Sequence, residues 1–535
     1  MQLKSIAVSL LLLASCEALR ILVVFPMASK SHSILGHGVV NRLLEAGHEV
    51  VHLTAIPREE PEKNLKEIVV PDGVESLSKS YPENFNSLTL KNIVGKPNVD
   101  STFFFDLAFD FHKLFLEDKN VVEFLGNPKE KFDAVIIEWF FSDVVAGIAP
   151  LFQCPLIWLG STEAHWEVIK LVDNIPGPAD NVDLFSTHTP PLHFWDRLSE
   201  LWKMFKKIIK MNLISYPKEK ELYKNYFPRI ADKRGVTMPS YETAVYNGSL
   251  LLLNSHPTIR TPHSLPQSAK YVGGYHIDFK PKPLPEDIQY LMDTARYGVI
   301  YFSMGSNLKS SDMSEEMKRR ILYIFSTFKQ RIFWKFEGEL NNIPPNVFLM
   351  KWAPQQSILA HPTLRLFITH GGQLSTTEAI HYGVPVIGVP VLADQHLNMD
   401  TVIQKGLGLK VNLNVDNFAY ELGLAMTEML ITQKYKQRAR ELSEIYHHRP
   451  ISPRKEIVHW VEHVVKTQGA PHLRSPSLMM PWYQKMYIDL ITIVCSLLIL
   501  SLNLINRIRY YYSIRHKVNK AEKQIQKSAL NKKVR

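Results

Sequence analysis

The residues best suited to chemistry lie in one short segment of the second half of the chain. An apolar run is followed by His370, Gly371 and Gly372, and then by Ser375 and Glu378. Glycines between a strand and a helix let the backbone approach a ligand, and the N–H groups that open the helix can hold a diphosphate. The Ser-x-x-Glu spacing also fits an ordinary capping box, so this segment alone predicts either a nucleotide site or a common helix start.

A candidate general base follows the first expected strand, 21–25. His32 stands between that strand and a helix expected at 34–46, in a loop at the carboxyl edge of a parallel sheet. Imidazole can accept a proton from a hydroxyl near neutral pH. The alternative is a loop histidine with no chemical role, and the competing His37 should lie within the helix.

A base histidine needs a carboxylate that sets its tautomer and stabilises its charged form. Two acids are candidates: Glu138 ends the strand expected at 134–137, and Asp143 follows five residues later. Either could orient His32, and either could instead cap the next helix. The sequence leaves this choice open.

The elements that must position these residues are short apolar runs alternating with amphipathic stretches. Runs that are apolar on both faces favour parallel strands covered by helices, and the repeated βαβ pattern predicts an α/β fold with two doubly wound sheets. The expected strands are 21–25, 50–54, 134–137, 156–159, 250–253, 299–303, 332–336, 348–351, 366–369 and 384–389.

Three prolines in 279–285 predict a linker between two domains, because that spacing excludes a helix and a strand interior. We expect one domain at 19–278 and a second at 286–445. Return helices and a membrane-proximal segment should occupy 446–487. Aromatic-rich stretches at 103–125 and 193–235 predict helical insertions in the first domain.

The positive charge is concentrated at the C-terminal end. Residues 506–535 hold ten Lys or Arg and one acid, which accounts for nine of the net +10. The remainder is nearly neutral, which argues against an extended nucleic-acid-binding face. This basic tail follows an apolar stretch, 488–505, that is flanked by tyrosines and just long enough to span a bilayer. A buried core helix is the alternative.

The ends of the chain carry membrane and targeting signals. Residues 1–18 have the features of a cleaved signal peptide. The positive-inside rule places the tail in the cytosol, so we expect a single-pass type I protein with lumenal domains. Lys532 and Lys533 resemble a dilysine signal of the endoplasmic reticulum, although an ordinary solvated charge run is the alternative. Cys154 is the only lumenal cysteine expected, and Asn247 begins the only glycosylation sequon.

The combined motifs resemble the UDP-glycosyltransferase family, in its UDP-glucuronosyltransferase-like arthropod form. Around the segment at His370 lie Trp352-Ala353-Pro354-Gln355, Gly305-Ser306, Gly383-Val384-Pro385, Pro390 and Asp394-Gln395. The resemblance runs from signal peptide to tail. It implies two Rossmann-like domains of the GT-B type that face a cleft. The domain at 19–278 would bind the acceptor, and the domain at 286–445 would bind the donor, a UDP-sugar.

The resemblance also implies roles for individual residues. Trp352 would stack on uracil, Gln355 would contact the nucleoside, and Glu378 would accept both ribose hydroxyls. Residues at and around the turn that contains Gly372 would hold the phosphates. Two residues at the start of a later helix would hold the sugar hydroxyls. The phosphate group comprises His370, Ser375, Ser306 and Lys335, and the sugar group comprises Asp394 and Gln395.

Two further positions bear on the resemblance. His32 matches the family's Ser-His pair that begins catalysis, and Glu138 stands where many relatives have aspartate. Leu374 stands where relatives commonly have asparagine, so the polar contact that the asparagine side chain makes in them must be absent here or made by another residue.

The expected reaction is an inverting transfer of a hexose from a UDP-sugar to a hydroxyl of a small lipophilic acceptor, as in detoxification. The sequence of 301–308 resembles that of arthropod members of the family, which mostly use UDP-glucose, so the resemblance favours glucose as the sugar. No Asp-x-Asp occurs, so we expect no metal and no cofactor besides the donor. The alternatives are a non-catalytic membrane-bound binding or scaffold protein of the same fold, or a transferase for one specific endogenous lipid or steroid. Besides the UDP-sugar, the acceptor and the membrane, a second copy of the chain is a candidate partner. A nicotinamide oxidoreductase is disfavoured because no Gly-x-Gly-x-x-Gly follows the first strand.

Overall fold

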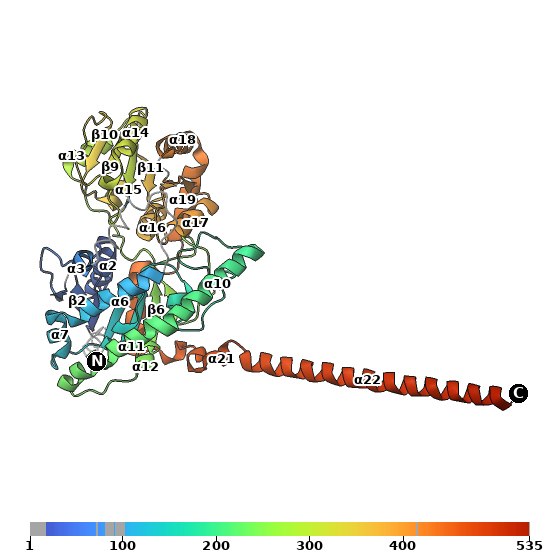
Figure 1. Ribbon diagram of the computed structural model, residues 1–535. Coiled ribbons are helices and arrows are strands. Elements are labelled where there is room, and N and C mark those ends of the chain that lie inside the picture. Colours follow the sequence, from blue (N-terminus) through green and yellow to red (C-terminus); the bar gives the residue numbers. More distant parts are fainter. Residues whose placement is uncertain (1–17, 71–72, 81–89, 91–101, 414–415, 534–535) are drawn as a thin grey trace, which may run out of the picture. The chain divides into compact units, whose positions relative to one another are not determined.

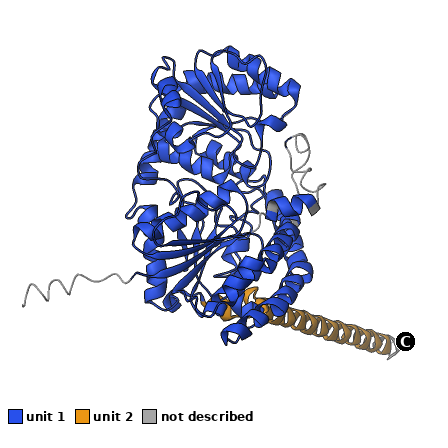
Figure 2. Cartoon of the chain, turned by 90° about the vertical axis from the view of Figure 1, so that its left-hand side faces the viewer, with its two compact units in different colours: residues 1–475 blue, residues 476–535 orange. Residues whose placement is uncertain are grey.

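The chain divides into two compact units, residues 1–475 and 476–535, which Figure 2 distinguishes by colour. The computed structural model describes residues 18–70, 73–80, 90, 102–413 and 416–533. The expected signal peptide, 1–18, therefore lies almost wholly outside the described residues. Both predicted sheets belong to the first unit, and the α/β architecture is confirmed.

The first sheet has seven parallel strands in the order β3-β2-β1-β4-β5-β6-β7. Its central strands are buried on both faces, as their continuous apolar runs predicted. The strands are β1 (Arg20–Phe25), β2 (Glu49–Thr54), β3 (Leu65–Val69), β4 (Ala134–Trp139), β5 (Leu156–Gly160), β6 (Gly248–Leu253) and β7 (Ala269–Tyr271). The register pairs Val24 of β1 with Ile137 of β4, so Phe25, the last residue of β1, and Glu138, the next to last residue of β4, lie at the same edge of the sheet.

Helices pack on both faces of this sheet (Figure 1). Helix α2 begins at Lys30, earlier than expected, so His32 lies in its first turn rather than in a loop. The predicted insertions form α6, α7, α10 and α11. The helices are α2 (Lys30–Glu45), α3 (Gly73–Ser80), α6 (Thr102–Glu117), α7 (Lys119–Gly126), η1 (Val144–Gly147), α8 (Ile148–Phe152), α9 (Trp166–Ile169), α10 (Phe194–Lys210), η2 (Met211–Ser215), α11 (Tyr216–Arg234) and α12 (Tyr241–Val245).

The second sheet has six parallel strands in the order β10-β9-β8-β11-β12-β13. Apolar side chains pack in a separate core on each of its faces. Its strands are β8 (Val299–Ser303), β9 (Arg331–Lys335), β10 (Val347–Met350), β11 (Leu364–Thr369), β12 (Val386–Gly388) and β13 (Gly408–Lys410). Its helices are α13 (Glu286–Asp293), η3 (Ser310–Asp312), α14 (Glu315–Ser326), α15 (Gln355–Ala360), α16 (Gln373–Tyr382), α17 (Gln395–Gln404), α18 (Phe418–Ile431) and α19 (Gln433–His447).

After the second sheet the chain returns to the first one. Helix α20 (Pro453–Lys466) buries Ile457, Val461 and Val464 in the core beneath α2 and β1, and η4 (Pro471–Leu473) follows it. Residues 279–285, the expected linker, contain neither helix nor strand. The first sheet is therefore covered in part by residues nearly two hundred positions beyond its last strand.

The second unit contains η5 (Pro476–Met479), α21 (Trp482–Lys485) and one long helix, α22 (Ile488–Lys533) (Figure 1). Among the described residues, α22 is the one helix long and apolar enough to cross a membrane. The helix continues past 505 through the basic segment, so the apolar stretch 488–505 and the basic residues after it belong to one uninterrupted helix.

Candidate active site

His32 is held by a buried carboxylate. The helix α2 that carries it follows β1, and Glu138 lies near the end of the adjacent strand β4. The Nδ1 atom of His32 is 2.5 Å from Oε1 of Glu138. The same carboxylate oxygen accepts a hydrogen bond from the Ser161 hydroxyl, just after β5. This contact leaves Nε2 of His32 as the ring nitrogen that can take a proton.

Asp143 does not contact His32. One of its carboxylate oxygens accepts the indole N–H of Trp139 at 2.7 Å, and the other is 2.5 Å from the Lys170 ammonium. Asp143 is buried within this ion pair. The interpretation in which Asp143 orients the histidine is therefore wrong for this geometry, and Glu138 is the acid in contact with His32.

The environment of His32 favours its protonated form. Burial lowers the pKa of the imidazole, but Glu138 and, more weakly, Asp394 outweigh burial and hold the pKa above the usual 6.5. A base works in its neutral form, so activity should fall as the pH drops through this raised pKa.

Replacing Glu138 by glutamine should move that acid limb to lower pH. The amide removes the negative charge that raises the His32 pKa, while burial still lowers it. The rate at neutral pH should nevertheless fall about tenfold or more, because the imidazolium formed in the transition state loses its partner. A pH profile of kcat/KM measures both effects, and an unshifted acid limb would show that Glu138 does not set the His32 pKa.

An aromatic cluster adjoins the base. The Phe140 ring meets the imidazole edge-on at a centroid distance of 5.3 Å. Phe141 lies 5.3 Å from Phe140 and 6.0 Å from Phe185, and Phe104 lies 5.0 Å from Phe185. The imidazole of His32 therefore borders a group of apolar rings from the loops and helical insertions of the first sheet. Such rings are suited to contact a lipophilic molecule.

The turn after β11 has little space for side chains. Gly371 has a positive φ of 82° and Gly372 caps α16. A Cβ on Gly372 or on Gly305 would lie 2.6 Å from Nε2 of His370, so both glycines are needed to seat the imidazole against the backbone. Burial, with a contribution from Lys335, lowers the pKa of His370 to about 4, so the neutral ring carries one N–H that it can donate to a ligand.

Polar side chains of α15 and α16 form a connected group. Nε2 of Gln355 donates to Oε2 of Glu378 at 2.6 Å and to the Ser375 hydroxyl at 3.2 Å. Gln356 donates to the other Glu378 oxygen at 3.2 Å. Three of the residues predicted to bind the donor therefore meet, and Glu378 lies where two vicinal hydroxyls could replace the amide donors.

Positive charge gathers beside Trp352, which is half exposed after β10. The Lys30 ammonium lies 4.1 Å from the ring centroid and that of Lys335 lies 5.5 Å away. Lys335 ends β9 and pairs with Glu337 at 2.5 Å. The indole thus offers a flat apolar face next to two ammonium groups, as a nucleotide would require.

Asp394 and Gln395 open helix α17. Asp394 accepts the Asn398 amide at 2.8 Å, and burial raises the pKa of its carboxyl against the effect of Arg260. The side-chain amide oxygen of Gln395, Oε1, accepts hydrogen bonds from the backbone N–H groups of Val391 and Leu392 at 2.9 and 3.1 Å. Asn398 of the same helix therefore fixes the Asp394 carboxylate, whereas the Gln395 side chain holds the backbone of the loop that precedes α17.

Several residues that join the two sheets at this site were missed from the sequence. Arg260 donates to Oε1 of Gln373 at 3.0 Å, and Ser29 donates to Asn307, the neighbour of Ser306, at 3.0 Å. Leu374, the departure from the family pattern, packs against the core of the first sheet. An apolar contact of Leu374 therefore stands in place of the polar contact expected for asparagine at this position. No local pattern marks Arg260 or Asn307, because their partners lie far away in sequence.

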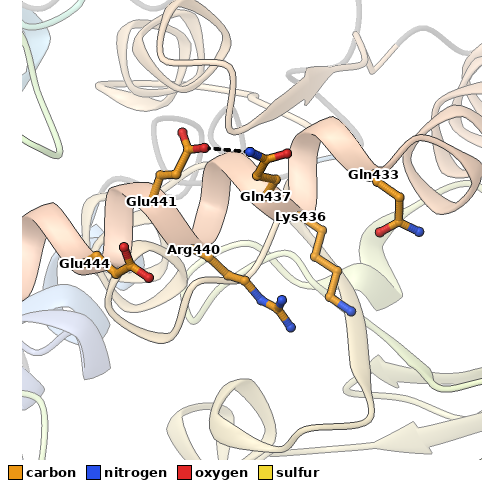
Figure 3. Close-up of a pocket in the computed structure, with 6 residues that line it drawn as sticks. All are labelled: Gln433, Lys436, Gln437, Arg440, Glu441 and Glu444. Carbon is orange, nitrogen blue, oxygen red and sulfur yellow. Dashed lines mark hydrogen bonds between the residues drawn. The ribbon is translucent and has the colours of Figure 1, made fainter.

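A surface hollow over α19 does not compete with this site. Figure 3 shows its lining, in which Gln437 donates to Glu441 at 3.0 Å. The lining residues are Gln433, Lys436, Gln437, Arg440, Glu441 and Glu444. All come from one face of a single helix, and none belongs to the groups around His32 or His370. This is a solvated helix face with i,i+4 pairing.

Known proteins resemble the whole chain. Residues 20–524 match the family described as UDP-glucoronosyl and UDP-glucosyl transferase. UDP-glycosyltransferase UGT5 of Dactylopius coccus is 32% identical over 493 residues, which covers 90% of this chain and 89% of that protein. UDP-glucuronosyltransferase 3A1 of Homo sapiens is 28% identical over 495 residues, with 90% and 91% covered.

Solved structures share the fold. The calicheamicin glycosyltransferase CalG4 superimposes with a TM-score of 0.55 at 19% identity, over 84% of this chain and 98% of that one. Arabidopsis thaliana UGT89C1, solved with UDP-L-rhamnose, gives 0.53 at 17% identity, over 84% and 100%. These likenesses confirm the predicted GT-B architecture. Together with a family match that extends from β1 into α22, they lead to one conclusion: the chain belongs to the UDP-glycosyltransferase family and is an enzyme that uses a UDP-sugar.

Proposed function

We propose that the enzyme transfers glucose from UDP-glucose to a hydroxyl of small lipophilic molecules, with inversion and without a metal ion. The observation that carries this proposal is the 2.5 Å contact between His32 and Glu138, next to an aromatic cluster. It supplies an oriented base where a lipophilic acceptor would bind.

The proposed reaction is one displacement. Nε2 of His32 takes the proton of the acceptor hydroxyl, and the acceptor oxygen attacks the anomeric carbon on the side opposite UDP. The carbon–oxygen bond to UDP breaks as the new bond forms, so the configuration inverts. The N–H groups that open α16, the neutral His370 and the Lys335 ammonium would stabilise the charge that grows on the diphosphate.

The charge around Asp394 supports a neutral sugar. Arg260 is buried and lies between two carboxylates: NH2 is 3.9 Å from Asp394 and Nε is 3.7 Å from Glu163. One cation is shared by two acids, and Arg260 also donates to Gln373. The uronate carboxylate of UDP-glucuronate would add a third negative charge here, whereas the C6 hydroxyl of glucose adds none.

An assay with several UDP-sugars and an acceptor panel tests the proposal. The full chain should use UDP-glucose better than UDP-glucuronate, release UDP in the presence of EDTA, and form the β-glucoside of a phenol, as proton NMR can show. A steroid belongs in the panel because a viral relative is named ecdysteroid UDP-glucosyltransferase. Faster transfer from UDP-glucuronate would refute the sugar assignment, and binding without turnover would favour a non-catalytic role.

Replacing Trp352 by alanine should weaken UDP binding about 10- to 100-fold, because stacking of a base on an aromatic ring contributes about 1–3 kcal/mol. Trp352→Phe should recover most of the affinity. Calorimetric titration with UDP measures the change. Tyr323→Ala, at an exposed ring on α14, is the matched control and should bind UDP normally. Equal affinity of the Trp352→Ala variant and the control would remove the stacking assignment.

We also propose where the enzyme works: anchored by α22 in the endoplasmic reticulum membrane as a single-pass type I protein, with the first unit in the lumen, in detoxification. The long apolar helix and the basic residues that continue it support this placement.

A further inference from the structure

His276 lies in the loop that follows β7, between the first sheet and the linker to the second. Its side chain is fully buried, and neither of its ring nitrogens makes a hydrogen bond with another described residue. The Nε2 atom is 3.5 Å from Oε1 of Glu378. Burying a polar group without a hydrogen bond is costly, so an imidazole that faces a carboxylate in this way calls for a functional reason.

A second contact joins the same loop to Glu378. The backbone N–H of Asp278 donates to Oε1 of Gln356 at 3.2 Å. The Gln356 amide in turn donates from Nε2 to Oε1 of Glu378 at 3.2 Å. The loop therefore reaches one oxygen of this carboxylate twice, directly through His276 and indirectly through Gln356. The other oxygen is held by Gln355, from the second sheet's own helix α15.

Helix α2 fixes the position of His276 from the other side. Gly38 of α2 has no room for a side chain, because a Cβ there would lie 2.9 Å from Cα of His276 and 3.1 Å from the Tyr275 ring. Glycine permits such a close approach of two backbones, and rotation of a side chain could not relieve the contact in its absence. The helix that carries His32 therefore rests on the residue that faces Glu378.

We propose that His276 is a positioning residue of the donor site, which holds the Glu378 carboxylate in the orientation that the ribose hydroxyls require. This inference rests on the proposed function, in which Glu378 accepts those hydroxyls of a UDP-sugar. A ribose hydroxyl would replace the Gln356 amide on Oε1, and an N–H at Nε2 of His276 would keep that oxygen in place, because a carboxylate oxygen accepts two hydrogen bonds. The affinity for the nucleoside then depends on a residue supplied by the first half of the chain.

Binding of UDP to the full chain in nanodiscs tests the positioning without any turnover. His276→Ala should raise the Kd of UDP about tenfold, the effect of losing a hydrogen bond to a charged group. His276→Gln keeps an N–H donor and should recover most of the affinity, whereas His276→Phe keeps only a ring and should not. The KM of the UDP-sugar should rise in parallel while kcat stays near the wild-type value. Equal recovery by phenylalanine, or an unchanged Kd of His276→Ala, would overturn the proposal.

A double-mutant cycle shows whether His276 acts through Glu378. In a chain that already carries Glu378→Ala, the His276→Ala substitution should change the Kd of UDP by less than about twofold, because the carboxylate that it positions is gone. Two fully additive losses would mean that His276 acts elsewhere. Normal UDP binding by Glu378→Ala alone would refute the donor site itself, whereas weak binding by Glu378→Ala with normal binding by His276→Ala would overturn the present inference alone.

A substitution on α2 decides the question if the His276 variants fold poorly. Gly38→Ala adds a Cβ against the backbone of His276 and should weaken UDP binding several-fold, although it lies on a helix of the first sheet. Gly36→Ala is the matched control on the same helix, because its Cβ would instead meet the Phe25 ring at 2.9 Å. The control should bind UDP like the wild type at equal folded fraction. Equal weakening by the two variants, or by neither, would contradict the proposal.

Discussion

Replacing His32 by alanine should lower kcat about 10²- to 10⁴-fold, the usual contribution of a positioned general base. His32 is the imidazole in contact with Glu138, and Phe140 borders it on the side of the aromatic cluster. The acceptor hydroxyl would then have to lose its proton to water. UDP affinity should stay near the wild-type value, because the predicted nucleotide contacts lie on the second sheet.

His37→Ala is the matched control for this prediction. It lies five residues further along α2, where its nearest carboxylate is Glu67 at 3.9 Å, and burial lowers its pKa to about 4. The control should retain most of the rate when the two variants are compared at equal folded fraction by thermal melting. If His37→Ala lost the rate and His32→Ala kept it, the base would be assigned to the wrong histidine.

Replacing Glu378 by alanine should weaken binding of the UDP-sugar about 100-fold or more. In the proposed donor site its carboxylate would accept two ribose hydroxyls, and a hydrogen bond to a charged group contributes about 1.5–3 kcal/mol. The variant also leaves the Gln355 and Gln356 amides without their acceptor. Titration calorimetry with UDP, and the KM of the UDP-sugar, should change in parallel.

Glu444→Ala serves as the control for Glu378. It removes an exposed acid from the hollow on α19 and should leave UDP affinity unchanged. If Glu444→Ala weakened UDP binding and Glu378→Ala did not, the nucleotide would bind at the hollow and the donor site proposed here would be wrong.

The central strands could be predicted from the sequence because they are buried on both faces. A continuous apolar run such as that of β6, Gly248–Leu253, has few other uses in a soluble domain. The three missed strands lack that signal. β3 is a half-exposed edge strand with charged residues, and β7 and β13 have three residues each. In β13, Gly408 is required because a Cβ would collide with the Val386 carbonyl.

The donor segment was predictable because its residues are neighbours in sequence. The turn at His370 and the helix after it place Ser375 and Glu378 by local geometry alone. The choice between Glu138 and Asp143 was not predictable. Both acids are buried. Their roles differ because Lys170 and Trp139 bind the Asp143 carboxylate, which leaves Glu138 as the acid that contacts His32. Side-chain partners of that kind depend on tertiary packing.

The position of α20 limits how the enzyme can be taken apart. Residues beyond 450 bury Ile457, Val461 and Val464 in the core of the first sheet, and Arg454 pairs with Glu45 of α2 at 2.8 Å. A chain cut in 279–285 would leave the half that contains the first sheet without part of its own interior. A chimera that exchanges the first half between relatives in order to change the acceptor must therefore replace two separate stretches of sequence, 19–278 and the α20 segment. The two stretches have to come from the same relative.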